Sequence, residues 1–280
     1  MTNIPNGEVS ASKFNTAFGR AGCGMKFYYR YIEKIRGPVN AGLLAGIAFD
    51  QATRAYHDSL IDNKPSLEYM GVFAREWENP QEENRDGEIV DYDLSGAPMD
   101  ILERGATALR TYVNSTAGMV PIDTQVFVER EFEETDAKLI GYIDLIEEVD
   151  GGVCVTDVKS SLSGKKKWTV EEAARDAQLG IYSILADGDV KAVGWRHARL
   201  GGKIEVGATH VATPNRDTVL RRITGWMSDL EHWCTTGDFA PTGLDRDAWV
   251  CSAKYCDYYN RCPHGAATRT VIPMTIGGRK

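Results

Sequence analysis

Two aspartates and one lysine are the residues of this chain whose types and spacing best suit chemistry. Asp157 follows Asp144 by thirteen positions, and Lys159 lies two positions after Asp157. A tight turn at Gly151-Gly152 predicts two antiparallel strands, which would bring Asp144 beside the other two residues. Carboxylates are hard ligands for Mg²⁺ or Mn²⁺, and the backbone carbonyl of Val158 is free to turn toward the same ion. A metal-bound water oriented by Lys159 would suit attack on a phosphodiester.

Spacing alone slightly favours a simpler interpretation, an exposed Asp–Lys pair on an edge strand that contributes little to stability. Gln178 and Tyr182 change this balance. They lie four positions apart on a helix that we expect to begin at Thr169, where Thr169 and Glu172 form a capping-box pattern. Residues four apart share one face of a helix, so the amide and the hydroxyl should point together toward the carboxylates or a phosphate.

The elements that must position these residues describe an α/β core, a mixed sheet flanked by helices. We expect one domain over residues 1–280, since this length can bury a full core. Its parts are a helical N-terminal part (10–120), a catalytic core (121–215), a C-terminal helix with a cysteine segment (216–265) and a tail (266–280). Hydrophobic periodicity and turn signals predict helices at 10–36, 42–62, 100–114, 169–186 and 216–235, strands at 125–132, 138–149, 153–160, 191–200 and 203–212, and an acidic loop at 78–96.

Composition limits the classes of function. A net charge of −8 and a pI of about 5.3 argue against a nucleic-acid binder that works by overall charge. A local basic track remains open. No apolar run approaches the roughly 18–20 residues that span a bilayer, and the polar N-terminus lacks the apolar core of a secretory signal, so we expect a cytoplasmic protein with no membrane contact. The residues that could form a basic track are Lys165, Lys166, Lys167, Arg196, Arg199, Arg221 and Arg222.

The cysteines point to a metal. The chain has six, and in the cytoplasm they should not form disulfides. Three fall in the last thirty residues, at Cys251, Cys256 and Cys262, one fewer than the four ligands that structural zinc and iron–sulfur sites usually take. The spacing does not name the metal. The candidates for the fourth ligand are Cys23, Cys234 and, for zinc only, His264.

Taken together, the motifs resemble the PD-(D/E)XK nuclease superfamily, in particular its RecB-like branch. That branch has GxxD, then DxK or ExK, then QxxxY, and this chain has Gly141…Asp144, Asp157-Val-Lys159 and Gln178…Tyr182. The resemblance implies a restriction-endonuclease-like fold. It also implies that Asp144, Asp157 and the Val158 carbonyl bind Mg²⁺ or Mn²⁺, that Lys159 is catalytic, and that Gln178 and Tyr182 organise the site or contact DNA.

The chain departs from the family pattern at one ligand. The family's first helix usually carries a metal-binding histidine in a Gly-x-x-x-His pattern, whereas Gly46 is followed at that position by Asp50. A carboxylate can replace an imidazole on magnesium and is the harder ligand. We therefore expect Asp50 to join the metal site, with His57 as the alternative. Glu129 stands where the family often has a strand glutamate.

The resemblance also suggests an identity for the cysteine-bound metal. Many RecB-like nucleases, including CRISPR-associated RecB-like exonucleases and the AddB helicase-nuclease subunit, hold a [4Fe–4S] cluster with one cysteine before the nuclease core and three after it. Their first cysteine begins a segment similar to Cys23-Gly-Met-Lys-Phe-Tyr-Tyr-Arg-Tyr31. The resemblance implies a structural cluster that joins the two ends of the chain, with the ligands Cys23, Cys251, Cys256 and Cys262.

These expectations converge on a metal-dependent DNase. The resemblance implies an exonuclease acting on single- or double-stranded DNA ends, in recombination, repair or phage DNA metabolism. The chain has no P-loop, so a helicase or recombination partner would be a separate protein. One alternative is a non-catalytic nucleic-acid-binding or assembly module that keeps the fold with an iron–sulfur or zinc site. Another is a zinc-stabilised protein whose Asp–Lys group is incidental.

Overall fold

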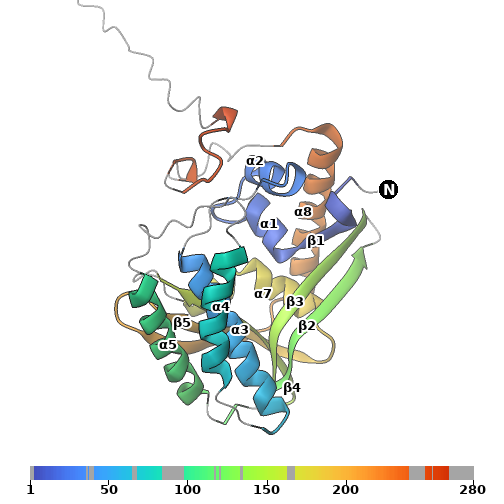
Figure 1. The fold of residues 1–280 in the computed structure, drawn as a ribbon. Helices are drawn as coiled ribbons and strands as arrows, with labels where there is room; N and C mark the ends of the chain where they lie inside the picture. The colour runs from blue at the N-terminus through green and yellow to red at the C-terminus, as the bar shows by residue number, and fades with distance from the viewer. Residues whose placement is uncertain are drawn as a thin grey trace, which may run out of the picture.

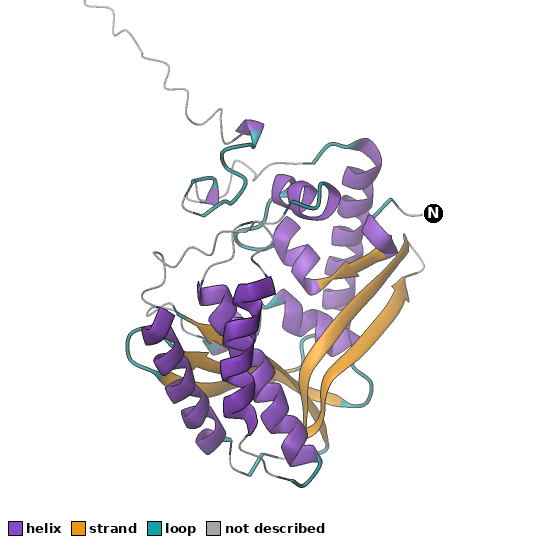
Figure 2. Cartoon of the chain, in the orientation of Figure 1, coloured by secondary structure: helices purple, strands orange, loops and turns teal. Residues whose placement is uncertain are grey.

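A mixed six-stranded sheet lies between two groups of helices in the computed structural model of the chain (Figures 1 and 2). This confirms the expected α/β class. The structure describes residues 3–35, 37, 41–64, 68–83, 98–116, 118–119, 121–132, 135–162, 168–239, 250–253 and 255–264.

The strands follow the order β1-β3-β4-β5-β6, with β2 also paired to β3. β1 and β3 are parallel, as are β4 and β5, and the other neighbours are antiparallel. The strands are β1 (Glu8–Ser10), β2 (Pro121–Phe132), β3 (Thr135–Val149), β4 (Gly152–Ser161), β5 (Val190–Arg199) and β6 (Glu205–Ala212).

Strand β3 has a gap along one of its edges. β2 pairs with it from one end to the other, so β1 and β4 must both lie on the opposite edge. On that edge β1 pairs with residues 138–140, and β4 pairs with residues 145–149. Within the described chain, no strand pairs with residues 141–144 there. The stretch from Gly141 to Asp144 is therefore open.

One face of the sheet is covered by α3 (Ala41–Ile61), α4 (Glu68–Glu83) and α5 (Pro98–Ser115), which stand side by side in Figure 1. Apolar residues at three- and four-residue spacing give each helix a core-facing stripe. Leu44, Phe49, Phe73 and Leu109 are fully buried there, together with Leu200 after β5. This packing holds α3 across the sheet near β2 and β4.

The other face is covered by α1 (Ala11–Phe18), α7 (Ala177–Leu185) and α8 (Arg216–Thr236). Its core joins Phe14, Leu139, Val155, Leu179 and Met227. The described residues also form short helical turns: η1 (Pro5–Gly7), α2 (Gly24–Phe27), the π-helical η2 (Tyr28–Ile32) and α6 (Val170–Ala173).

Three expected elements were wrong in part, and one strand was missed. The helix expected at 10–36 is interrupted, because the chain becomes extended at Gly19 and helical structure resumes only at Gly24. The acidic loop at 78–96 begins inside α4, whose helix continues to Glu83 because Phe73 and Trp77 anchor it in the core; residues 84–96 lie outside the described chain. The helix expected at 169–186 is two helices, since Asp176 caps a new start by accepting a hydrogen bond from the Leu179 N–H. Strand β1 has three residues, too few to show a period.

The packing between α4 and α5 can be tested at a buried glycine. A Cβ on Gly105 would overlap the ring tip of Phe73, which is only 1% exposed. We expect Gly105→Ala to destabilise the fold by about 1–3 kcal/mol in urea unfolding, because the ring cannot move without disturbing its neighbours. The control is Gly71→Ala in α4, where a Cβ meets nothing within 4 Å; it should gain about 0.5–1 kcal/mol from helix propensity. Equal effects at both glycines would contradict the packing described.

Candidate active site

The candidate site lies where β3 and β4 separate. Their last pair is Leu145 with Thr156, and the next residues are Asp144 on β3 and Asp157 on β4. Asp144 spans the opening: its Oδ2 accepts a hydrogen bond from the Val158 N–H at 2.8 Å. A side chain thus takes the place of the backbone acceptor that a continued ladder would have supplied.

The same hydrogen bond shows the direction of the Val158 carbonyl. In an extended strand the N–H and C=O of one residue point to the same side. The Val158 N–H points to Asp144, so its carbonyl also points into the opening between β3 and β4. The backbone therefore offers an oxygen on the same side as the Asp144 carboxylate.

Lys159 and Gln178 close the site on the other side. Lys159 Nζ lies 2.7 Å from Asp157 Oδ2 and donates a hydrogen bond to Gln178 Oε1 at 3.0 Å. Gln178 Nε2 donates in turn to the Tyr182 hydroxyl at 2.9 Å. The four side chains form one chain of contacts that holds the ammonium group against the carboxylate.

Glycine is required at position 141 by the approach of Tyr182. A Cβ there would lie 2.8 Å from Cε1 of that ring, closer than side-chain atoms normally come. The Gly141…Asp144 spacing therefore has a packing reason: the glycine admits the tyrosine that orients Gln178, and the aspartate follows three residues later.

Asp50 belongs to the same electrostatic group, whereas His57 does not. The Asp50 carboxylate interacts with Asp157, Asp144 and Lys159. His57 is buried further along α3, and its Nε2 lies 3.1 Å from the hydroxyl of Tyr112. Burial, followed by the positive charge of Arg196, lowers the pKa of His57 to about 3 and keeps it neutral.

The three carboxylates carry more negative charge than the site neutralises. Burial, followed by the charge of Asp157, raises the pKa of Asp50 to about 6. Burial, followed by the charge of Asp50, raises the pKa of Asp144 to about 6. Burial, together with the charge of Asp144, raises the pKa of Asp157 to about 7. The positive charge of Lys159 opposes both shifts. Burial alone would lower the pKa of Lys159, but Asp157 and Asp144 outweigh it and hold that pKa above its usual value.

The donor set fits a divalent cation such as Mg²⁺. Asp157 is 1% exposed, and its Oδ2 has no well-directed hydrogen-bond donor, because the 2.7 Å contact with Lys159 is an ion pair of poor hydrogen-bond geometry. A buried anionic oxygen without a directed donor is suited to a metal. The oxygens of Asp50, Asp144 and Asp157 do not all lie within 4.8 Å of one another. That spread suits magnesium, which binds one or two carboxylates and keeps several waters.

The prediction of a surface basic track was wrong for two of its residues, Arg196 and Arg199. Arg196 and Arg199 are 15% and 11% exposed and pair with Glu147 and Glu205, so neither is free for a surface track. Both guanidinium groups are therefore mostly buried and bound by carboxylates of the protein itself. Lys165, Lys166 and Lys167 lie outside the described residues. Glu129 pairs with Lys138 on the surface. Of the remaining arginines, Arg221 donates to Thr218, and Arg222 stacks over Trp226.

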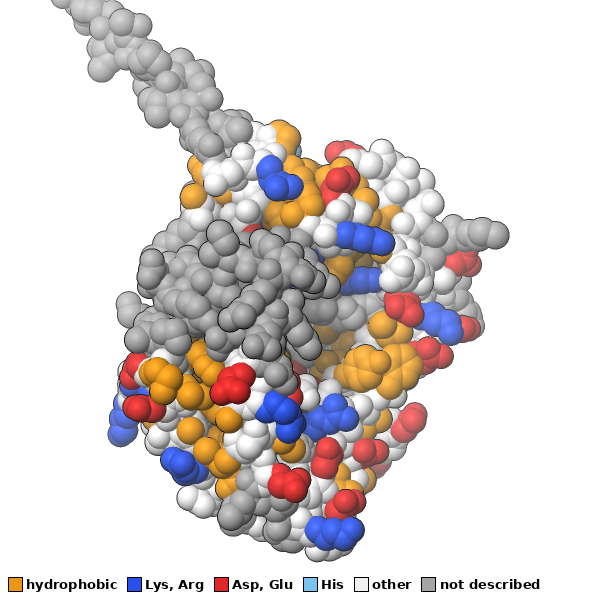
Figure 3. All heavy atoms as spheres, viewed as in Figure 1, with side chains coloured by type: hydrophobic (Ala, Val, Ile, Leu, Met, Phe, Trp, Pro, Cys, Tyr) orange, Lys and Arg blue, Asp and Glu red, His pale blue; other side chains and the backbone are white. Residues whose placement is uncertain are grey.

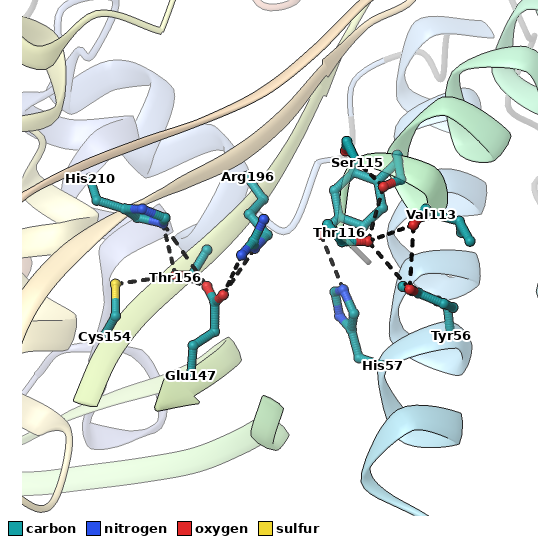
Figure 4. Close-up of polar contacts among 11 residues, drawn as sticks. Tyr56, His57, Val113, Ser115, Thr116, Glu147, Cys154, Thr156, Arg196 and His210 are labelled. Carbon is teal, nitrogen blue, oxygen red and sulfur yellow. Dashed lines mark hydrogen bonds and ion pairs between the residues drawn. The ribbon is translucent and has the colours of Figure 1, made fainter. Parts of the chain in front are cut away.

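Sequence reasoning missed one polar cluster. Glu147, Cys154 and His210 bring three ligand atoms within 4.8 Å of one another, which no other His, Cys, Asp or Glu group does in the described chain (Figure 4). Arg196 binds Oε1 of Glu147, and Thr156 donates to its Oε2 at 2.6 Å. Both oxygens are thus satisfied by protein donors, and the cluster serves to join β3, β4, β5 and β6. No spacing rule marks it, since its members come from three separate strands.

The cysteine-rich segment packs on the N-terminal part. Tyr29 and Tyr258 stack with ring centroids 5.2 Å apart, and Cys262 is buried with them. Burial, followed by the thiols of Cys262 and Cys23, raises the pKa of Cys251. Burial is also the main cause that raises the pKa of Cys256, and the thiols of Cys23 and Cys251 raise it further. Cys23, Cys251, Cys256 and Cys262 are therefore close enough to interact.

Cys234 stands apart from this group. It packs beside Trp233 on α8, and burial, followed by Glu231, raises its pKa to about 11. Its other electrostatic partner is Lys13 rather than another cysteine. Of the two cysteine candidates for the fourth ligand, the structure thus brings Cys23 to the C-terminal cysteines.

Comparison with known proteins establishes the family. The family model of the PD-(D/E)XK nuclease superfamily matches residues 8–263 of the chain, and this range includes every motif of the site. The protein belongs to the PD-(D/E)XK nuclease superfamily. Superfamily membership implies a nucleic-acid substrate and agrees with a site built from Asp144, Asp157 and Lys159. No curated protein matches the chain.

One solved structure supports the fold. A Eubacterium rectale protein provisionally designated an exonuclease is similar with a TM-score of 0.52 at 13% identity, covering 97% of this chain and 94% of that one. The protein SSO0001 has a TM-score of 0.38 at 16% identity, covering 86% and 94%, which does not establish a shared fold. Within the described residues, no helix has the length and apolar character needed to cross a membrane.

The raised carboxyl pKa values predict an unusual pH dependence of stability. A carboxyl whose pKa is higher in the folded protein binds protons that the unfolded chain releases, so its contribution is complete below about pH 4 and is lost as the pH rises through 6–7. With EDTA present, Asp50→Asn should therefore raise the Tm relative to wild type at pH 8 and much less at about pH 4. We expect about 1–2 kcal/mol after allowance for partial exposure, or a few degrees.

Mg²⁺ should reduce this difference at pH 8, because it stabilises the folded wild type by mass action. The control is Asp187→Asn, which removes the charge of an exposed aspartate outside the site. It should change the Tm by the same amount at both pH values. A Tm difference between wild type and Asp50→Asn that does not grow with pH would show that Asp50 carries no buried charge.

Proposed function

We propose that the protein is a Mg²⁺- or Mn²⁺-dependent deoxyribonuclease of the RecB-like branch that hydrolyses DNA from its ends. The observation that supports this most is the meeting of Asp144, Asp157 and Lys159 in the opening between β3 and β4. An isolated exposed ion pair would not need this arrangement. Here Asp157 is buried, and Lys159 is held by a glutamine on another element.

Each residue has a role that follows from its position. Asp144, Asp157 and the Val158 carbonyl would hold the cation, and Asp50 would bind it directly or through one of its waters. A cation held there would lower the pKa of a bound water and polarise the phosphate. Lys159 stays cationic because its pKa is raised, so it can orient the attacking water and stabilise charge that develops on the phosphate. Gln178 and Tyr182 keep the ammonium group in place.

The charge count supports a bound cation. When ionised, three carboxylates face one ammonium group, an excess of two negative charges in a largely buried site. Without a cation, the repulsion must be relieved by protonation, which is what the raised pKa values express. A divalent ion would neutralise this excess at neutral pH.

We also propose that Cys23, Cys251, Cys256 and Cys262 hold a [4Fe–4S] cluster. No three of these sulfur atoms lie within 4.8 Å of one another. The ligands of one tetrahedral zinc ion, with Zn–S bonds of ~2.3 Å, would be only about 3.8 Å apart. A four-iron cluster separates its thiolates more widely, because four metal ions and four sulfides lie between them. The sulfur positions therefore do not match a single tetrahedral zinc ion, and the motif order that resembles the RecB-like branch supports the [4Fe–4S] cluster.

The proposed biological setting is end processing in recombination, repair or phage DNA metabolism, with any helicase or recombination protein as a separate partner. The provisional designation of the Eubacterium rectale protein supports exonuclease action. A non-catalytic assembly module would not need Lys159 held between Asp157 and Gln178, with the Asp144 carboxylate bound to the neighbouring Val158 N–H. Their contacts therefore favour the enzyme.

A nuclease assay tests the catalytic proposal. We expect linear DNA to be degraded with Mg²⁺ or Mn²⁺, closed circular DNA to resist, and Asp157→Ala or Lys159→Ala to lose about 10²–10⁴-fold in rate. The chain supplies a matched control in Asp189 and Lys191, an exposed pair with the same spacing and a 2.6 Å contact. Alanine at either control residue should leave the rate unchanged. Wild-type activity in Asp157→Ala and Lys159→Ala would refute the proposed catalytic site.

Anaerobic purification tests the cluster. The wild-type protein should be brown, with about four irons per chain and the broad visible absorption of an iron–sulfur cluster. Cys23→Ser should lose the colour and the iron. Cys234→Ser should keep both, since Cys234 interacts with Lys13 and Glu231 away from the other cysteines. A colourless wild-type protein with stoichiometric zinc, or loss of iron from Cys234→Ser alone, would contradict the assignment.

A further inference from the structure

Glu147, Cys154 and His210 direct three different kinds of donor atom to one point of the sheet. Their carboxylate oxygen, thiol sulfur and imidazole nitrogen lie within 4.8 Å of one another (Figure 4). On the face of the molecule in Figure 3, acidic side chains are spread among basic ones, as on an ordinary solvated surface. Glu147 and Cys154 are instead buried, and a buried polar group needs a partner.

Strand pairing explains how the three residues meet. Glu147 on β3 and Cys154 on β4 are cross-strand partners, so their side chains share one face of the sheet. Thr156, two residues after Cys154, points to the same face. Thr156 is paired with Gly194 on β5, and Gly194 is paired with His210 on β6. His210 must therefore reach across β5 to join the other two residues.

Glycine at position 194 makes this reach possible. A Cβ on Gly194 would lie 2.3 Å from Cδ2 of His210, so the imidazole occupies the space that a side chain on β5 would fill. From there its Nε2 lies 3.5 Å from Oγ1 of Thr156 and 4.0 Å from Oε2 of Glu147. These distances are long for hydrogen bonds, so the ring is aimed at the group without a short contact to it.

Glu147 keeps an acceptor position for a cation although both of its oxygens have donors. An ionised carboxylate has about four lone-pair positions. Arg196 binds Oε1, and Thr156 donates to Oε2 at 2.6 Å, which leaves a second lone pair on the oxygen nearest to His210. The Thr156 hydroxyl would then orient a metal-binding carboxylate, as hydrogen-bond donors around metal sites commonly do.

We propose that Glu147, Cys154 and His210 form a Zn²⁺ site that joins β3, β4 and β6. Zn–N, Zn–O and Zn–S bonds of ~2.0–2.3 Å place tetrahedral ligand atoms about 3.3–3.7 Å apart. The imidazole, which is 33% exposed, has to move by less than about 1 Å to meet this geometry. Nitrogen and sulfur donors suit zinc and not magnesium, and the fourth position stays open to water.

The charges around the group are compatible with zinc. Burial lowers the pKa of His210, so its ring is neutral at pH 7 and can act as a ligand. The thiol of Cys154 gives up its proton when it binds the ion, as coordinating thiols do. Zinc and Arg196 then carry one positive charge more than the Glu147 carboxylate and the thiolate. We therefore expect the affinity to be moderate.

This site is separate from the one proposed for Mg²⁺. Thr156 and Asp157 are consecutive on β4, so their side chains point to opposite faces of the sheet. Glu147 and Asp144 lie three residues apart on β3 and also point to opposite faces. Zinc binding can thus be measured without reference to nuclease activity.

Zinc content tests the inference. The full-length protein, purified anaerobically, would be dialysed against Zn²⁺ with Mg²⁺ in excess, and its bound zinc measured by mass spectrometry. We expect His210→Ala and Cys154→Ser each to hold about one zinc ion per chain fewer than wild type. The matched controls are His232→Ala, at an exposed histidine of α8, and Cys234→Ser, and both should hold as much zinc as wild type. Because the His210 side chain is partly exposed, its removal should leave the fold intact, which circular dichroism checks.

Cobalt identifies the ligands. Co²⁺ in place of Zn²⁺ should add a thiolate-to-cobalt charge-transfer band that Cys154→Ser lacks and Cys234→Ser keeps. The carboxylate site offers only oxygen donors and cannot give this band. The cysteines at positions 23, 251, 256 and 262 are the same in both variants, so whatever metal they hold cancels in the difference spectrum.

The outcomes do not depend on whether the protein cleaves DNA. Wild-type zinc content in His210→Ala, or a retained charge-transfer band in Cys154→Ser, overturns the proposed site. A loss of zinc from His232→Ala as large as that from His210→Ala also overturns it, because zinc would then bind exposed histidines in general. Loss of zinc in the two site variants, with both controls unchanged, supports the site even if no nuclease activity is found.

Discussion

The hydrogen bond from the Val158 N–H to Asp144 is the interaction on which the candidate site depends. Two strands that have just formed a hairpin would normally continue to pair, because unpaired backbone groups in a protein interior are costly. Asp144 removes that cost for one N–H with its side chain. The strands can then diverge, and the divergence turns a continuous ladder into an opening lined by two carboxylates and a backbone carbonyl.

The opening is maintained by packing on both faces of the sheet. On one side, α7 presents Gln178 and Tyr182, and the tyrosine fits only because position 141 is glycine. On the other side, α3 presents Asp50, held by a core that includes Phe49 and Leu44. The cluster around Glu147 and Arg196 ties the sheet together beyond the opening. Rigid elements thus set the geometry, which is the usual requirement for a site in which distance determines reactivity.

This geometry has a cost in stability. Three buried carboxylates raise one another's pKa, and one lysine does not balance them. Such a group is a local conflict that a fold selected only for stability would not contain. It makes sense as a site completed by a cation. The segment Cys251–Cys262 packs against Tyr29 near the start of the chain, so two parts of the chain that are far apart in sequence lie together.

The amino-acid sequence by itself determined the fold class, most of the strands and the grouping of Asp144, Asp157, Lys159 and Gln178. It could do so because a tight turn, strand alternation and helical i, i+4 spacing are local properties. Only the tertiary structure decided between Asp50 and His57, which share α3 but lie seven residues, or about 10 Å, apart along its axis. It also brought Cys23 rather than Cys234 to the C-terminal cysteines, committed Arg196 to Glu147, and placed His210 beside Glu147 and Cys154. These outcomes depend on how whole elements pack, and no local spacing records that.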